Sequence, residues 1–259
     1  GAHGGCYELL RFDGQQLRRE ASNLSASPEA GYLADLDGDG LLEVILDQTD
    51  YYVFCYACGI RYPRFRVLRW DGAQFVPLVI AALPASAPAE VRDPNNRAVA
   101  LAQGGLWKDA QDAIVQAQAF QFQDPKLATT IGHAAALIDL HARAADQQAR
   151  EGPYPLLDHI LFGDYVAAVN VMRPYTVDEI WGPQTPLIAG TAAEGWEFEL
   201  TQWISRTTNL ALRAEPDLAA AYFIRGWGRH LRDPGHSEAV ADVERAAHLI
   251  PGDPLFTSS

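Results

Sequence analysis

The sequence has little of several features that mark familiar protein classes. Only two of its 20 basic residues are lysines, and its 33 acidic residues leave a net charge of −13. So acidic a chain offers no electrostatic footprint for nucleic acid and favours cations or basic partners. No apolar run reaches the roughly 18 residues that cross a bilayer. We therefore expect neither a nucleic-acid-binding surface nor a transmembrane segment.

Common catalytic motifs are also missing. The sequence contains no nucleophile elbow, P-loop, dinucleotide fingerprint or HExxH zinc motif. His133 and His141 share a face of one predicted helix, and we interpret them as unrelated surface histidines. The opening GAHGGCYELL lacks the charged and apolar regions of a signal peptide and does not begin with Met, so we expect a processed or excised chain. We predict that the protein is not an enzyme.

An internal repeat occupies the first third of the chain. Residues 7–20 align with residues 65–78 at an offset of 58, and each copy is typical of a strand, an Asp-Gly turn and a second strand. Two further β-rich runs, 43–48 and 51–56, lie between the copies. We predict that residues 5–80 form one and a half copies of a four-stranded antiparallel unit. The identical pairs are Leu10/Leu68, Arg11/Arg69, Asp13/Asp71, Gly14/Gly72 and Gln16/Gln74.

The pattern of apolar residues changes after residue 82. Residues 83–96 are rich in Ala and Pro, which is typical of a linker, and the apolar spacing beyond them is helical. The sequence predicts two helices separated at Gly104-Gly105, a long helix from about Pro125, and more helix at about 154–173, 197–214, 217–231 and 236–249. We expect an α+β protein with a β-module at 1–82, a linker at 83–96 and a helical domain at 97–259.

The last two predicted helices carry a spacing of small and aromatic residues. Tyr222 precedes Gly226 by four residues, Ala239 and Ala246 allow close helix packing, and Pro251 ends the second helix. This pattern resembles a tetratricopeptide (TPR) repeat, well at the end of the chain and loosely from about residue 95. The resemblance implies a solenoid of helical hairpins that binds protein.

An acidic loop lies between two predicted strands of the β-module, in GYLADLDGDGLLEVILD. Asp35, Asp37 and Asp39 alternate along it, and such dense carboxylates repel one another unless a cation lies among them. Calcium prefers six to eight oxygen ligands, and the glycines between the aspartates allow the backbone to curl. An EF-hand would require a bidentate Glu at position 12 of the loop, where the sequence has Leu46. The sequence therefore predicts a calcium loop that leads into a strand.

This loop resembles the FG-GAP or VCBS-type repeat of integrin-α-like β-propellers. The resemblance implies that Ca²⁺ is bound by Asp35, Asp37, Asp39, the carbonyl of Leu41 and Glu43, where the family usually has Asp. It also implies a structural role for the metal, since the chain fills the coordination sphere. A closed propeller requires about four blades or more, so we expect a single blade-like module that packs on the helices.

Three interpretations of the cysteines stay open. Cys55 and Cys58 could form a local disulfide in an exported protein, or they could be simple buried thiols. Alternatively, they could bind zinc together with His3 and Cys6, whose spacing also suits zinc. Redox catalysis is disfavoured because no thioredoxin-like βαβ pattern surrounds the pair.

Two further sequence features bear on partners. Asn23-Leu-Ser25 is a glycosylation sequon, although so short a pattern arises easily by chance. Residues 174–186, PYTVDEIWGPQTP, form a long irregular stretch within the helical region, where a partner surface that includes Tyr175 and Trp181 would be expected. An elaborate loop between helices is the alternative.

These features favour an extracellular, periplasmic or cell-surface scaffold. We expect a calcium-stabilised β-module joined to a TPR-like protein-binding region, with self-association through that region and through β edges into a fibre or surface layer. One alternative is a hydrolase with a site between module and helices. The other is a carbohydrate-binding protein that uses exposed tryptophans such as Trp181.

Overall fold

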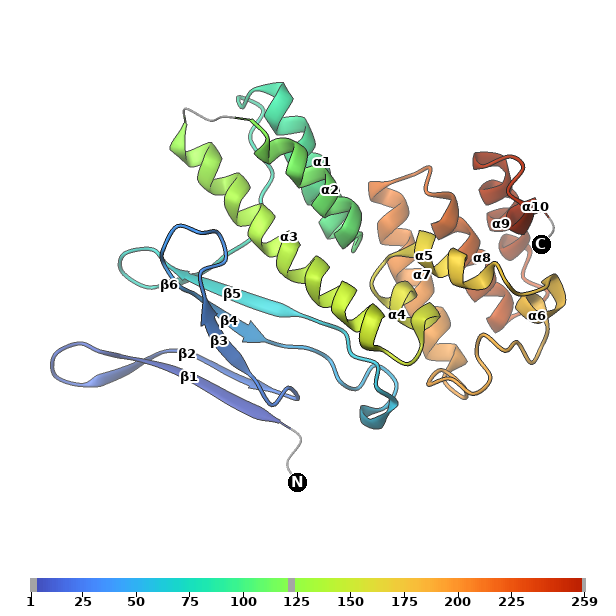
Figure 1. The fold of residues 1–259 in the computed structure, drawn as a ribbon, viewed down its shortest axis with the longest axis horizontal. Coiled ribbons are helices and arrows are strands. Elements are labelled where there is room, and N and C mark those ends of the chain that lie inside the picture. The colour runs from blue at the N-terminus through green and yellow to red at the C-terminus, as the bar shows by residue number, and fades with distance from the viewer. Residues whose placement is uncertain (1–3, 121–123, 258–259) are drawn as a thin grey trace. The chain divides into compact units, whose positions relative to one another are not determined.

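The computed structural model describes residues 4–120 and 124–257, and it has an α+β fold in which a small antiparallel β-region precedes a series of helices (Figure 1). The chain divides into two compact units, each made of several segments. Unit 1 comprises Gly1–Val53, Arg61–Val99 and Gln111–Ala144, and unit 2 comprises Phe54–Ile60, Ala100–Ala110 and Ala145–Ser259. The strands are β1 (Gly5–Phe12), β2 (Leu17–Ser25), β3 (Gly31–Ala34), β4 (Glu43–Asp47), β5 (Phe65–Trp70) and β6 (Phe75–Pro77).

The strands form two antiparallel sheets, a hairpin β1-β2 and a four-stranded sheet with the order β3-β4-β5-β6. Both hairpins of the predicted repeat are present, and their turns have the same hydrogen bonds. Asp13 N–H donates to Gln16 O, and Asp71 N–H donates to Gln74 O. Gly14 and Gly72 have φ values of 96° and 104°, which an Asp-Gly turn requires. The two matching hairpins are confirmed, but the predicted four-stranded unit starting with the first hairpin is wrong, because β1-β2 is a separate sheet and β3-β4-β5-β6 form the four-stranded one.

Strand β4 is buried on both of its faces, which places it at the centre of unit 1. Val44 and Leu46 face the hairpin β1-β2, where Tyr7, Leu9 and Ala21 pack against them. Ile45 faces the opposite way and packs, with Val67 of β5, against Leu137 and Leu140 of helix α3. Figure 1 shows the hairpin and α3 on either side of the sheet. Burial of each of these aliphatic side chains stabilises the unit by roughly 1.5–3 kcal/mol.

One buried amide joins the hairpin to the sheet. Asn23 of β2 is 8% exposed, and its Nδ2 donates to Ala30 O and to Asp47 O, each at 2.7 Å. Both side-chain hydrogens are therefore used within the folded unit. The sequon at Asn23 is not available for glycan attachment in this folded state.

The helices follow the strands in the chain, and several of their boundaries agree with the predicted ones. The breaks at Gly104-Gly105 and the helix start at Pro125 are confirmed, as is the helix over 197–214. The helices are α1 (Ala89–Gln103), α2 (Trp107–Gln118), α3 (Pro125–Glu151), α4 (Pro155–Leu161), α5 (Tyr165–Met172), α6 (Val177–Trp181), α7 (Glu197–Ala214), α8 (Ala219–Arg232), α9 (Ser237–Leu249) and α10 (Pro254–Thr257).

In unit 2, helix α8 packs against α7 on one side and α9 on the other. Gly226 of α8 lies where α9 approaches most closely, since a Cβ atom at this position would lie 2.9 Å from Ala239 O. A buried ion pair strengthens the contact, because Arg225 donates to both carboxylate oxygens of Asp242 at 2.8 and 2.6 Å. Bidentate pairing of this kind fixes the relative register of two helices.

Two local predictions differ from the structure. The run 51–56 is not a strand but a bend that leads into a 3₁₀ turn, Tyr56–Cys58, because Asp50 accepts a hydrogen bond from Tyr52 N–H and a disulfide curls the chain. The helix predicted over 154–173 is broken at Gly163, which has a φ of 75°. The next residue, Asp164, caps α5 by accepting from Ala167 N–H.

The other differences lie in segments expected to be irregular. Helix α1 begins at Ala89, so the second half of the Ala/Pro-rich stretch 83–96 is helical. Within 174–186, Thr176 and Glu179 form a capping box that starts the short helix α6. Among the described residues, no helix combines the length and the apolar character needed to span a membrane.

We predict that Asn23→Ala lowers the free energy of unfolding by about 2 kcal/mol. The reason is that Ala30 O and Asp47 O would lose their buried donor. Chemical denaturation measures the loss, and Ser22→Ala is the matched control, since Ser22 is the exposed neighbour on the same strand. Equal stability of the two variants would contradict the anchoring role of Asn23.

Candidate functional site

The acidic loop connects β3 to β4 and brings three carboxylates together. One oxygen from each of Asp35, Asp37 and Asp39 lies within 4.8 Å of the others. Gly38 and Gly40 have φ values of 79° and 86°, a conformation that curls the loop around this point. The structure therefore gathers the three aspartates that the sequence singled out.

Backbone amides hold each of these carboxylates in place. Asp35 accepts from Gly38 N–H at 2.7 Å and from Gly40 N–H at 3.0 Å. Asp37 accepts from Asp39 N–H, and Asp39 accepts from Leu41 N–H at 2.8 Å. A carboxylate has about four lone-pair positions, so each aspartate keeps capacity for a further ligand. An all-oxygen donor set of this kind fits a hard cation such as Ca²⁺.

Glu43 lies just beyond the loop, at the start of β4, and is only 3% exposed. Its Oε2 accepts from Leu36 N–H at 2.9 Å, which ties the two ends of the loop together. Burial raises the pKa of Glu43; the Leu36 hydrogen bond opposes this shift, and the charges of the three aspartates add to it. The side chain therefore lies in the field of the acidic group, and its ligation of a metal, like that of the Leu41 carbonyl, stays a prediction.

Helix α3 supplies a neighbour of the loop that sequence reasoning missed. The Nε2 atom of His133 lies 3.3 Å from Asp37 Oδ2, and both side chains are largely buried. Arg69 of β5 contacts both ring nitrogens of His133, including Nε2. Burial and then the charge of Arg69 lower the pKa of His133, whereas Asp37 and Asp39 raise it. His133 thus contacts the carboxylate of Asp37 from outside the loop.

The second predicted histidine on this helix has an unrelated environment. His141 Nδ1 lies 2.8 Å from Leu137 O, and its ring packs edge-on against Phe65. The two histidines contact different neighbours, as expected of unrelated residues, but the prediction of surface histidines is wrong, because His133 is largely buried and His141 packs against Phe65. No periodicity in the sequence would have paired His133 with Asp37, because the contact joins a loop to a distant helix.

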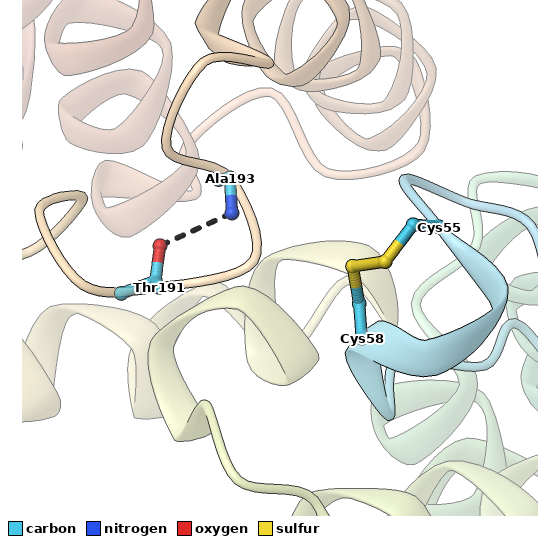
Figure 2. The surroundings of a disulfide bond; sticks show 4 residues. All are labelled: Cys55, Cys58, Thr191 and Ala193. Atoms are coloured by element: carbon cyan, nitrogen blue, oxygen red, sulfur yellow. Dashed lines mark hydrogen bonds between the residues drawn. A yellow bond between two sulfur atoms is a disulfide. The ribbon is translucent and has the colours of Figure 1, made fainter.

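The cysteine pair lies in unit 2 and forms a disulfide. Cys55 and Cys58 are bonded, with their Cα atoms 5.3 Å apart, on a turn that ends at Gly59. Figure 2 shows the disulfide with Thr191 and Ala193 in its surroundings, where Ala193 N–H donates to Thr191 Oγ1 at 3.2 Å. Cys6 is a free, exposed thiol in unit 1, and His3 lies outside the described residues.

A buried acid is connected to the disulfide turn by one glutamine. Gln148 Nε2 donates to Gly59 O at 3.1 Å and lies 3.3 Å from Asp158 Oδ1. Asp158 is fully buried, and its Oδ2 has no hydrogen-bond partner within the described part of the chain. Burial raises the pKa of Asp158 to about 6, and the Gln148 hydrogen bond offsets only part of that shift. No pattern in the sequence indicates this buried acid.

The aromatic residues of the predicted partner surface are only partly accessible. Trp181, at the end of α6, packs against Phe223 and His230, and its Nε1 is buried. Tyr175 is half-buried. More exposed aromatic rings occur at Trp196 and Phe198, which are 42% and 54% exposed. A stacking partner would reach these two rings more easily than Trp181.

Comparison with known proteins gives no family assignment. No protein-family model, no curated protein and no solved structure matches this chain.

We predict that Asp158→Asn removes a pH-dependent penalty on stability. The folded pKa of about 6 lies above the ordinary value of 3.8, so the wild-type carboxyl contributes its full stability below about pH 4 and loses it as the pH rises through 6. The variant should gain up to about 3 kcal/mol relative to wild type between pH 4 and pH 8.

Thermal melting of both proteins at several pH values measures this difference. Asp146→Asn is the control, because Asp146 is an exposed acid on the same helix as Gln148. Parallel pH profiles for wild type and Asp158→Asn would contradict the burial penalty.

Proposed function

We propose that this protein is a non-enzymatic scaffold of the extracellular or periplasmic space, in which a bound Ca²⁺ stabilises an FG-GAP-like β-module. The observation that carries the proposal is the convergence of Asp35, Asp37 and Asp39 on one point of the β3-β4 loop. Three carboxylates at this separation repel one another, and a divalent ion would replace repulsion by attraction. The bound ion supplies only charge and coordination geometry at this place.

The position of the loop supports a structural role for the ion. The loop leads directly into β4, the strand that is buried between the hairpin β1-β2 and α3. Glu43 and His133 connect the loop to β4 and to α3. Residues outside a ligand set that orient its members commonly tune metal affinity. An ion held here would therefore stabilise the sheet that organises unit 1.

The proposed location is supported by the calcium concentration and by the disulfide. Loops of this type that bind Ca²⁺ weakly become occupied where the ion is abundant, outside the cytoplasm. Disulfides such as Cys55–Cys58 also persist in oxidising compartments. The two features are independent of each other, and both favour the same compartments.

The helical part of unit 2 supports the proposed protein-binding role. Helices α7, α8 and α9 pack consecutively, as in a stack of TPR-like hairpins. Gly226 and the small residues Ala239 and Ala246 allow the close approach that such hairpins require. Trp196 and Phe198 add exposed aromatic rings of the kind that often anchor protein partners.

We predict that Ca²⁺ raises the melting temperature of the protein and that EGTA reverses the effect. At an ion concentration of 100 times Kd, binding stabilises the folded state by about 2.7 kcal/mol, which corresponds to roughly 5–10 °C for a chain of this size. Titration calorimetry and melting in Ca²⁺ and in EGTA measure both effects. Absence of binding heat together with an unchanged melting temperature would contradict the metal role.

We predict opposite effects of Asp39→Asn with and without the ion. The amide oxygen can still accept from Leu41 N–H, but the loss of one charge should weaken Ca²⁺ binding at least about tenfold, or about 1.4 kcal/mol. In EGTA the same variant should be at least as stable as wild type, because it relieves repulsion among the carboxylates.

Asp71→Asn is the matched control for this variant. Asp71 also accepts backbone amides in an Asp-Gly turn, from Ala73 and Gln74, but it lies outside the cluster of three aspartates. Calcium affinity should be unchanged in this control. If both variants lowered the affinity equally, the ion would not be bound by the β3-β4 loop.

A further inference from the structure

The two hairpins of the internal repeat have the same register. Residue Leu10 pairs with Arg19 in the first hairpin, as Leu68 pairs with Pro77 in the second. The pair Phe12 and Leu17 likewise corresponds to Trp70 and Phe75. Strand β1 is therefore the structural counterpart of β5, and β2 is the counterpart of β6.

The second hairpin pairs with another strand along its β5 edge, whereas the corresponding β1 edge of the first hairpin has no strand partner among the described residues. The edge of β5 that faces away from β6 pairs with β4 along Phe65–Leu68. The equivalent edge of β1, residues 7–10, pairs with no strand among residues 4–120 and 124–257. The repeat thus identifies an edge that has a strand partner in one copy and none in the other.

The backbone of β1 offers hydrogen-bonding groups along that edge. Asp13 N–H donates to Gln16 O, across the turn and toward β2. Amides alternate in direction along a strand, so those of Leu10 and Glu8 point away from β2. These are the groups that an added strand would use.

The β1 edge also lacks the features that usually prevent pairing. It spans eight residues without proline, whereas the edge strand β6 spans three and ends at Pro77. Apolar side chains remain exposed around it, with Leu10 at 48% and Phe12 at 63%. Leu24, across from Cys6 on β2, is 82% exposed.

Charge favours a second copy of this chain as the occupant. The chain as a whole has a net charge of −13, so most of its surface repels another copy. Residues 5–25 instead have three acids and three arginines, a net charge of zero, namely Glu8, Asp13, Glu20, Arg11, Arg18 and Arg19. Two hairpins can therefore approach one another with little electrostatic cost.

We infer that β1 pairs antiparallel with β1 of a second copy, which joins the two hairpins into one four-stranded sheet about a two-fold axis. This inference rests on the proposed scaffold role and assigns the self-association expected from the sequence to a particular strand. A register centred on Leu9 places Glu8 opposite Leu10 of the other copy, so no like charges meet. Both copies use the same surface, so the assembly closes as a dimer.

A pair of variants at Glu8 tests the edge. Glu8→Pro removes an outward N–H and should weaken dimerisation at least tenfold, whereas Glu8→Thr keeps the N–H and should dimerise as wild type does. Light scattering after gel filtration over a concentration series measures the mass of the full chain, and circular dichroism verifies its folding. A wild-type chain that is monomeric at every concentration, or equal dimerisation of the two variants, would overturn the inference.

A measurement on the unsubstituted chain does not depend on the folding of any variant. Cys6 is the only cysteine outside the disulfide, so a spin label attaches there alone. With Leu9 at the centre, the two Cys6 positions are six residues apart along paired strands, about 20 Å. Pulsed dipolar spectroscopy should give a distance near this value, and a dimer with widely separated labels would overturn the β1 pairing.

Both experiments are performed in Ca²⁺ and in EGTA. A β1-linked dimer without any calcium binding would support this inference and contradict the metal role. Calcium binding by a chain that stays monomeric would support the metal role and contradict this inference. A dimer that persists in Glu8→Pro would leave the scaffold proposal intact while overturning the assignment to β1.

Discussion

The burial of strand β4 on both faces is the constraint on which the rest of unit 1 depends. Val44 and Leu46 contact the hairpin on one side, and Ile45 contacts helix α3 on the other. Side chains alternate along a strand, so a shift of one residue would present the wrong set to each layer. The register of β4 therefore fixes the positions of the hairpin, of α3 and of the acidic loop that precedes the strand.

The acidic loop combines local and distant forms of support. Backbone amides from Gly38, Gly40 and Leu41 orient the carboxylates locally, and they do so within one short segment. His133 reaches the loop from helix α3, and Arg69 of β5 contacts the ring of His133. Local hydrogen bonds shape the loop, while these longer-range contacts hold it against the core. A site with both kinds of support needs little rearrangement to accept an ion.

Sequence reasoning succeeded where structure is decided locally. The Asp-Gly turns at residues 13–14 and 71–72 specify hairpins through their own φ angles and hydrogen bonds, so both could be predicted. Alternation of aspartate and glycine likewise marked the three clustered carboxylates. The strand expected over 51–56 was wrong because the disulfide at its end, a covalent constraint, overrides β propensity. The helix predicted over 154–173 was also interrupted by a local constraint, because Gly163 has a positive φ that an α-helix does not allow.

Contacts between segments that are distant in the sequence could not be predicted from the sequence. Nothing in the pattern around His133 indicates Asp37, and nothing around Asp158 indicates that Gln148 connects it to Gly59. Both contacts result from tertiary packing. Apolar periodicity predicts which face of a helix is buried, but it does not predict which residue lies against that face. Asn23 shows the same limit, because its amide serves the fold of unit 1 and not the glycan that its tripeptide suggested.

The discontinuous make-up of unit 1 has a consequence for biosynthesis. Its sheet is complete by residue 77, yet the helical segment that covers Ile45 and Val67 includes Leu137 and Leu140. A ribosome adds residues from the N-terminus onward, so the strands are synthesised before α3. The apolar face that contains Ile45 and Val67 therefore has no helix to cover it until α3 has been synthesised. During that interval the aliphatic side chains that α3 later buries are uncovered, and exposed surface of this kind favours aggregation.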